Sequence, residues 1–310
     1  MNTFSVTFGN VLLTLLYLVP GYLLCRARMV RPEHMSSVST ILLYICGPCM
    51  FLNSLTRMEF SRLLSLRMLQ FFLVTLLTMS VFLVLLFLLL GKRRRDFTGR
   101  ILSLATMMGN VGFFGLPIVQ AAFPDAPEAA AYSCVFCASM NILAWTLGVF
   151  CLTGDRKYIS LKAAVVNPTV LSVALGLVLY FTRARDWMPE LLQGGIQTMG
   201  SMSTALCMMI LGVRLSTMSL KELFTQPTVW MAVLGKLIAF PLFGYALVWL
   251  IPFSPVFRAS ILILSGTPCA SILLNLAEIH GNGQRLAANC ALLSTLLSVI
   301  TIPLLSLLLG

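Results

Sequence analysis

Ten apolar stretches of membrane-spanning length, separated by short polar connections, constrain the fold of this 310-residue chain more than any other feature. Only 10% of the residues are charged, whereas soluble domains typically contain about 25%. A spanning helix needs about 20 apolar residues to cross about 30 Å of hydrocarbon. The sequence therefore predicts an all-α membrane protein with ten transmembrane helices. The stretches lie at residues 8–25, 36–56, 68–90, 100–122, 129–152, 160–181, 194–215, 228–250, 257–279 and 285–308.

A short polar connection at residues 153–159 divides the ten predicted spans into two sets of five, at residues 1–152 and 160–310. Because five is odd, the two sets must run through the membrane in opposite directions. Two such halves are the sequence pattern of an inverted repeat, which is common among secondary transporters. We therefore expect two inverted five-helix repeats.

The positions of Lys and Arg predict the orientation of the chain. Most of the 21 basic residues lie in alternate connections, at residues 26–31, 92–100, 156–162 and 214–221 and at Arg285. The positive-inside rule makes these connections cytoplasmic, which places both termini outside the plasma membrane. The net charge of +11 is thereby explained without a nucleic-acid partner, and the cluster at residues 92–95 suits anionic membrane lipid.

Two helix-breaking stretches, at residues 109–117 and 265–271, lie within the fourth and ninth predicted spans. Irregular backbone survives at membrane depth only where it is buried in protein or lines a cavity, so these breaks predict a binding site. Proline is favoured in the first turn of a helix, and Pro117 and Pro268 are therefore each expected to start an outgoing half-helix. The positively polarised ends of two half-helices would hold a carboxylate without Lys or Arg.

Asn110 is the leading candidate side chain in the first break, because its amide can donate to a substrate carboxylate. The alternative is that it caps the preceding half-helix. Gly112 and Gly115, which flank Phe113, are expected to allow close backbone approach and positive φ angles. Ordinary packing of small residues between helices is the alternative for both glycines.

The second break offers Gly266, Thr267 and Pro268, followed by Ser271 and Asn275 on one face of the next half-helix. These polar side chains either line the site or form hydrogen bonds between helices.

Two further positions in the spans are candidates for the site. In the second span, Cys46 and Pro48 indicate either a kink or a substrate contact. In the eighth, Lys236 lies about 12 Å from the inner end. It either extends to the inner interface, as long basic side chains do, or balances the charge of the substrate.

The nine cysteines include two C-x-x-C pairs, Cys46 with Cys49 and Cys134 with Cys137. Both pairs lie in apolar spans without a nearby histidine, so we interpret them as small packing residues. No metal site, cofactor or catalytic residue is predicted, because the spans contain no H-E-x-x-H, no G-x-S-x-G and no paired aspartates.

Several motifs resemble those of one transporter family. Residues 110–117 read Asn-Val-Gly-Phe-Phe-Gly-Leu-Pro, and residues 294–303 read Ser-Thr-Leu-Leu-Ser-Val-Ile-Thr-Ile-Pro. Their order across the chain resembles that of the auxin efflux carrier family, which includes plant PIN-formed carriers and bacterial malonate or malate permeases. Supporting matches lie at residues 167–168, 211–213, 236–241 and 266–268.

The resemblance implies a carrier whose broken fourth and ninth helices cross near the membrane midplane and hold a small organic anion. The anion would be a mono- or dicarboxylate such as malate or malonate, or an auxin-like acid, and a homodimer is also implied. No Asp or Glu lies at the centre of a span, so coupling to a proton, to sodium or to neither stays open. An anion channel or ligand sensor on the same fold, and an intramembrane enzyme, are the alternatives.

Overall fold

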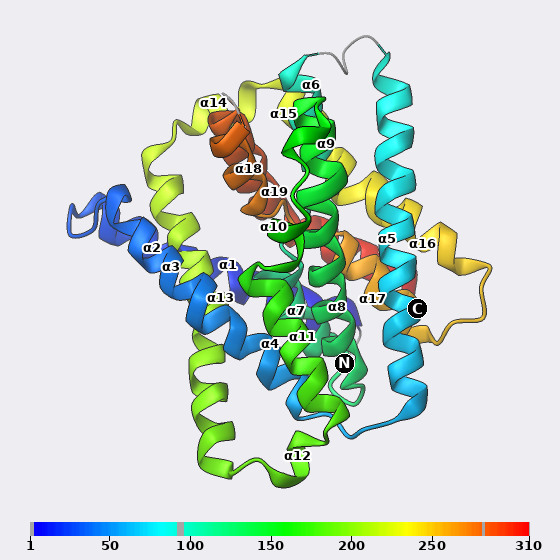
Figure 1. The fold of residues 1–310 in the computed structure, drawn as a ribbon. Coiled ribbons are helices and arrows are strands. Elements are labelled where there is room, and N and C mark those ends of the chain that lie inside the picture. The colour runs from blue at the N-terminus through cyan, green and yellow to red at the C-terminus, as the bar shows by residue number, and fades with distance from the viewer. Residues whose placement is uncertain (1–2, 92–95, 281–282, 310) are drawn as a thin grey trace.

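A computed structural model describes residues 3–91, 96–280 and 283–309 (Figure 1). Within these ranges all regular structure is helical. The first half of the chain contains α1 (Thr3–Leu16), α2 (Leu18–Arg26), α3 (Met35–Ile41), α4 (Gly47–Thr56), α5 (Arg62–Leu90), α6 (Phe97–Ala105), α7 (Leu116–Ala122), α8 (Glu128–Leu143) and α9 (Val149–Thr153). The second half contains α10 (Leu161–Val165), α11 (Pro168–Phe181), α12 (Ala184–Trp187), α13 (Glu190–Thr217), α14 (Leu220–Thr225), α15 (Pro227–Leu234), α16 (Phe240–Trp249), α17 (Pro255–Ser265), α18 (Ile272–His280) and α19 (Gln284–Ser306).

Seven helical stretches in the described residues are long and apolar enough to span a membrane. They are Thr3–Arg26, Pro32–Thr56, Arg62–Leu90, Glu128–Thr153, Glu190–Thr217, Pro227–Trp249 and Gln284–Leu309. Shorter apolar helices, Val111–Ala122, Pro168–Phe181 and Pro255–Ser265, lie where the fourth, sixth and ninth spans are predicted. The membrane class is thus supported, whereas the complete ten-span inverted repeat stays a prediction. The basic cluster at residues 92–95 lies outside the described residues.

The sixth predicted span, 160–181, is divided in two by an Asn-Pro pair. The residue before a proline avoids the helical region, and Asn167 accordingly has an extended backbone. Its side-chain oxygen accepts a hydrogen bond from the Val170 amide at 3.0 Å and so caps α11.

Four wide π turns interrupt the spans, at Leu42–Cys46, Val111–Gly115, Ala144–Gly148 and Gly235–Ala239. A proline follows three of them two residues later, namely Pro48, Pro117 and Pro241. A proline within a helix lacks an N–H group and clashes with the carbonyl four residues earlier. In each case that carbonyl belongs to the π turn, which provides the wider backbone that the ring requires. The Cys46–Pro48 break is therefore a π turn within a continuous helix.

The helices form two groups that meet at the cavity described below and also pack directly against each other, α4 and α11 against α8. The α13 group contains α2, α3, α4, α11 and α13, and the α8 group contains α5 to α9 and α15 to α19. Within the α13 group, α2 and α13 approach closely because Gly21 and Gly212 lack side chains. A Cβ atom at either position would lie 2.0 Å from a carbonyl oxygen of the other helix. α1 lies between the groups and packs against α19 and α7.

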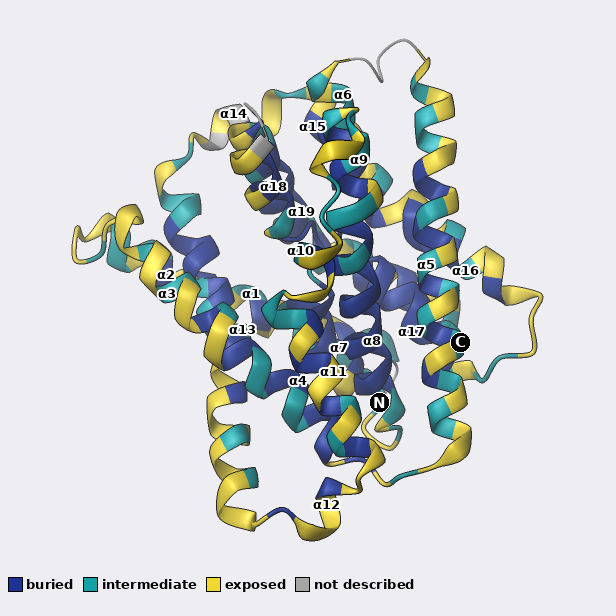
Figure 2. Cartoon of the chain, in the orientation of Figure 1, coloured by how far each residue is buried: buried dark blue, intermediate teal, exposed yellow. Residues whose placement is uncertain are grey.

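Large apolar residues are exposed on the outside of the bundle as well as buried in its interior, and Figure 2 shows where the exposed and the buried residues lie along the helices. α5 exposes a row of leucines, including Leu66, Leu69, Leu73 and Leu77, whereas most residues of α8 are buried. Such a surface is stable only against hydrocarbon, which agrees with the membrane class.

Candidate functional site

The two helix breaks lie against each other. α6 ends at Ala105 and its partner half-helix begins at Val111, while α17 ends at Ser265 and α18 begins at Ile272. Between these ends Gly109 and Cys269 form an antiparallel bridge. The Asn110 amide donates to the Pro268 carbonyl at 2.7 Å, and the Ala270 amide donates to the Met108 carbonyl at 3.0 Å. We call residues 106–110 and 266–271 the junction.

Neighbouring helices satisfy further backbone groups of the junction. The Cys269 amide donates to the Ser294 hydroxyl at 2.9 Å, and the Cys269 thiol donates to the Ala105 carbonyl at 3.2 Å. Ser133 of α8 donates to the Val111 carbonyl at 2.9 Å. Unpaired groups at membrane depth are costly, so these contacts let the two breaks persist.

Gly109 is the glycine of the junction that packs most closely against neighbouring side chains. A Cβ atom there would lie 2.5 Å from the Thr267 hydroxyl oxygen and 3.0 Å from Nζ of Lys236. Only glycine leaves space for both neighbours.

The prediction that Pro117 and Pro268 start the outgoing half-helices is wrong for Pro268 and only partly met by Pro117, which lies in the first turn of α7. The first begins at Val111, six residues before Pro117, because the π turn extends the helix backwards. The second begins at Ile272, since Pro268 lies in the extended junction and its carbonyl accepts the Asn110 hydrogen bond. The first helix start therefore lies nearer the junction than predicted, whereas the second lies four residues later than predicted, just beyond the junction.

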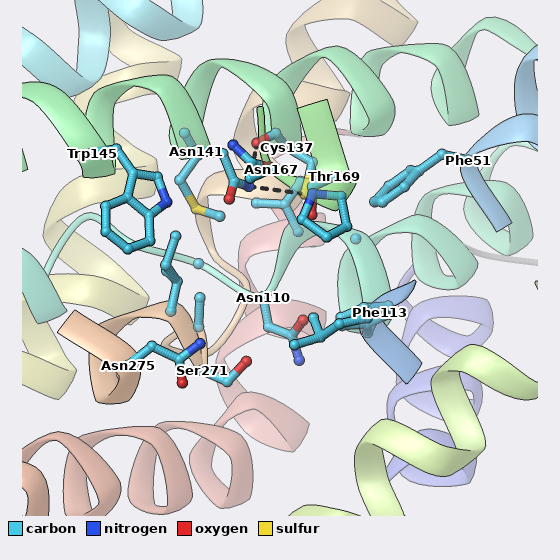
Figure 3. Close-up of a pocket in the computed structure, with 18 of the residues that line it drawn as sticks. Phe51, Asn110, Phe113, Cys137, Asn141, Trp145, Asn167, Thr169, Ser271 and Asn275 are labelled. Atoms are coloured by element: carbon cyan, nitrogen blue, oxygen red, sulfur yellow. Dashed lines mark hydrogen bonds between the residues drawn. The ribbon is translucent and has the colours of Figure 1, made fainter. Parts of the chain in front are cut away.

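A cavity of about 320 Å³ opens beside the junction (Figure 3). Both helix groups line it, together with three of the four π turns. Its polar side chains are Asn110, Asn141, Asn167, Thr169, Ser271 and Asn275, and its aromatic side chains are Tyr44, Phe51, Phe113 and Trp145. No charged residue lines this cavity among those that the structure describes.

The asparagines of the cavity differ in whether their side chains already form hydrogen bonds within the protein. Asn141 donates to the Cys137 carbonyl at 2.8 Å, and Asn167 donates to the Ala163 carbonyl at 3.1 Å. The side-chain amide of Asn110 makes a single contact within the described residues, with the Cys207 sulfur at 3.7 Å. In the described chain, the side chains of Ser271 and Asn275 make no hydrogen bond. Asn110, Ser271 and Asn275 therefore have polar groups available for a ligand.

Two helix N-termini contribute positive polarisation to the cavity. Val111–Ala122 and α18 both begin at its wall, where Gly112, Phe113 and Ile272 are lining residues. The first N–H groups of a helix have no acceptor within it, and each helix start carries the equivalent of about half a positive charge. This arrangement favours a negatively charged ligand without a basic side chain.

A second cavity, of about 450 Å³, adjoins the first. Both are lined by Leu43, Asn110, Phe113, Ser271 and Asn275. The second cavity extends towards residues 32–40 and also contains charged side chains, namely Glu33, Arg214 and Glu278. Asn110 thus stands between the two spaces.

Five of the predicted site residues line the first cavity. They are Asn110, Gly112, Phe113, Ser271 and Asn275. Gly112 and Gly115 do not adopt positive φ angles, which among the described glycines occur at Gly91 and Gly154. Both instead allow close packing, Gly112 against Phe51 and Gly115 against Leu264 and Thr267.

The other predicted site residues lie outside this cavity. Thr267 donates to the Leu264 carbonyl at 2.7 Å, and Gly266 packs against Leu305. Pro117 lines a separate cavity of about 330 Å³ that shares no lining residue with the first. Cys46, Pro48 and Pro268 are likewise absent from the lining of the first cavity.

Lys236 does not extend to the interface. It is fully buried, and its Nζ donates to the Ser265 carbonyl behind the junction. The carbonyl end of α17 thus provides the hydrogen-bond acceptor for this buried amino group.

Sequence reasoning missed the cavity residues of the second and fifth spans, including Tyr44, Asn141 and Trp145. A polar asparagine within an apolar span was the available signal for Asn141. Tyr44 and Trp145 carried none, because their exposure to the cavity depends on π turns that no simple periodicity reveals.

The nine cysteines form no disulfide bond. Within the described residues, no group of three or more His, Cys, Asp or Glu side chains is placed to hold a metal ion.

Comparison with known proteins places this architecture in a family. A family model described as "Membrane transport protein" matches residues 6–163 and 157–306. An uncharacterized transporter of Methanocaldococcus jannaschii is 25% identical over 305 residues, which cover 95% of this chain and 96% of that protein. The family comprises membrane transporters, not enzymes. The chain therefore belongs to the membrane transport protein family of the auxin efflux carriers, as its motifs predicted.

Proposed function

We propose that this protein is a secondary transporter that moves a small organic anion across the plasma membrane. The observation that carries the proposal is the uncharged cavity at which two helix N-termini meet. Backbone amides and the available side chains of Asn110, Ser271 and Asn275 are donors suited to a carboxylate. Aromatic side chains provide apolar contact for the remainder of the molecule. We propose a mono- or dicarboxylate such as malate or malonate, or an auxin-like acid.

The position of the cavity favours alternating access as the mechanism. The α13 group contributes Tyr44, Phe51 and Asn167 to its wall, and the α8 group contributes Asn110 and Asn275. A movement of one group against the other would therefore change which side of the membrane the cavity faces. Such rocking around a fixed central site is typical of transporters with broken helices.

The side that is open in this structure is the one predicted to be cytoplasmic. The first cavity continues through Asn110 and Asn275 into the second, towards residues 32–40. In the opposite direction Phe51 packs against Gly112 and separates the cavity from the space beside Pro117. We propose that the structure represents an inward-facing state.

Transport by purified protein in liposomes tests the proposal. Vesicles loaded with one of several unlabelled carboxylates would receive the same labelled compound outside, and saturable counterflow is the expected result. Absence of counterflow for malate, malonate, pyruvate and indole-3-acetate would count against an anion carrier. Replacing Na⁺ with choline and collapsing the pH gradient would then identify a coupling ion.

The same assay separates a carrier from an anion channel or a ligand sensor, either of which could use the same cavity. A carrier gives slow, saturable flux, a channel gives single-channel currents, and a sensor binds the anion without moving it.

A further inference from the structure

Lys236 is the only charged side chain that is buried among the described residues. It lies in the π turn Gly235–Ala239, and its Nζ lies 4.9 Å from the centre of the Phe240 ring. Charged groups at membrane depth are rare because their burial is costly, and they usually have a function. The cavity accounts for no such function, since Lys236 does not line it.

The ammonium group lies behind the junction, on the side where the incoming half-helices end. Nζ donates to the carbonyl of Ser265, the last residue of α17, and lies close to Gly109. Carbonyl ends of helices are negatively polarised and amide ends are positively polarised. The junction therefore has a basic side chain at its carbonyl ends and, in the proposed function, the anion at its amide ends.

This positive charge has no buried acidic partner in the described residues. The groups that surround Lys236, namely Gly109, Phe240, Ser265 and Thr267, all belong to the α8 group. In the proposed transport cycle, Lys236 would therefore move together with the junction and the bound anion.

We infer that Lys236 is protonated and is the charge-compensating residue of the carrier, an inference that rests on the proposed function. When the cavity holds a monoanion, the buried part of the α8 group then carries no net charge, because the ammonium group of Lys236, the only buried charged side chain in the described residues, offsets the carboxylate. When the cavity is empty, the same buried part carries one positive charge. The membrane potential acts on the return of the empty carrier and not on the loaded step.

The two steps can be measured separately by two modes of transport in proteoliposomes whose membrane potential is set by K⁺ and valinomycin. Exchange of labelled for unlabelled pyruvate uses only the loaded carrier, whereas net pyruvate uptake also requires the empty carrier to return. For a whole charge crossing the whole field, 100 mV changes the distribution by about 50-fold at most. An interior-negative potential is expected to slow net uptake several-fold and to leave exchange unchanged.

In the Lys236→Gln variant, the step that depends on voltage is expected to be the movement of the loaded carrier and not the return of the empty carrier. Its loaded carrier has one negative charge and its empty carrier has none, so exchange is expected to become several-fold slower at interior-negative potential. Lys236→Arg keeps the charge and is expected to retain voltage-independent exchange. When the substrate is the dianion malonate, the loaded carrier should have one negative charge in the unsubstituted protein and two in Lys236→Gln. The voltage dependence of malonate exchange should therefore be larger in the variant.

Equal voltage dependence of exchange in the unsubstituted protein and in Lys236→Gln would overturn the inference. If Lys236→Gln does not fold, the unsubstituted protein still decides, because voltage-dependent pyruvate exchange contradicts a neutral loaded carrier. Uptake with this unexpected voltage dependence leaves the proposed anion transport intact. Absence of any carboxylate uptake by the unsubstituted protein would overturn both proposals.

Discussion

At the scale of single residues, the cavity distinguishes side chains that maintain the fold from those available to a ligand. Asn167 caps a helix, and Asn141 donates a hydrogen bond to a carbonyl of its own helix. Both side-chain amides therefore already have hydrogen-bond partners in the protein. Asn110 has only a long contact with a sulfur atom. It also stands where the two cavities meet, and an anion that passes between them would pass this side chain.

Asn110→Ala is expected to reduce transport by about 10- to 100-fold, because a hydrogen bond to a charged group contributes about 1.5–3 kcal/mol. Initial uptake rates in liposomes, normalised to folded protein, measure the effect. Asn10→Ala is the matched control, since the Asn10 side chain donates a hydrogen bond to the Val6 carbonyl of its own helix and does not line the first cavity. Equal rates for the two variants would remove Asn110 from the site.

Gly109→Ala tests the closest approach in the junction. The added methyl group would lie 2.5 Å from the Thr267 hydroxyl oxygen, and such overpacking costs about 1–3 kcal/mol or more. The thermal midpoint in detergent should fall, whereas Gly195→Ala, which meets no atom within 4 Å, should leave it unchanged or raise it. A midpoint unaffected by Gly109→Ala would contradict the observed packing.

At the scale of elements, most interruptions of a helix have an identifiable structural cause. Three of the four π turns accommodate prolines, and the two breaks pair with each other through backbone hydrogen bonds. α19 contributes the most direct side-chain support, because Ser294 accepts the hydrogen bond of the buried Cys269 amide.

Ser294→Ala should therefore destabilise the protein by about 1–3 kcal/mol, the cost of leaving a buried donor without an acceptor. Ser298→Ala is the control. Ser298 is equally buried in α19, but its hydroxyl bonds only the Thr295 carbonyl of its own helix. Thermal midpoints of the two variants should differ by several degrees, and similar midpoints would show that the junction does not need Ser294.

At the scale of the whole molecule, two helix groups meet at one cavity that continues towards residues 32–40. The ends of the chain lie near each other, since α1 packs against α19 and the turn at Leu307–Leu309. This proximity agrees with termini on one side of the membrane. Their placement outside the cell stays a prediction, as does the homodimer that the family resemblance implies.

Ser271→Cys tests the proposed inward-facing state and the orientation together. Ser271 is exposed within both cavities, so a membrane-impermeant thiol reagent should reach it in inside-out vesicles and not in right-side-out vesicles. The unsubstituted protein provides the background from its nine cysteines. Labelling only from the outside would reverse the proposed orientation or the proposed state.

The sequence alone determined the membrane class, the approximate limits of seven spans and the positions of both breaks. These features depend on local chemistry: the length of apolar runs, and prolines and glycines that cannot continue a helix. Motif order also indicated the family, and the polar side chains at and after the breaks, Asn110, Ser271 and Asn275, indicated part of the cavity wall. Tertiary structure alone decided that the breaks pair, that the helices restart at Val111 and Ile272 and that Lys236 is directed behind the junction. The pairing joins segments about 160 residues apart, and the Lys236 hydrogen bond joins residues 29 apart, and no local pattern encodes either contact.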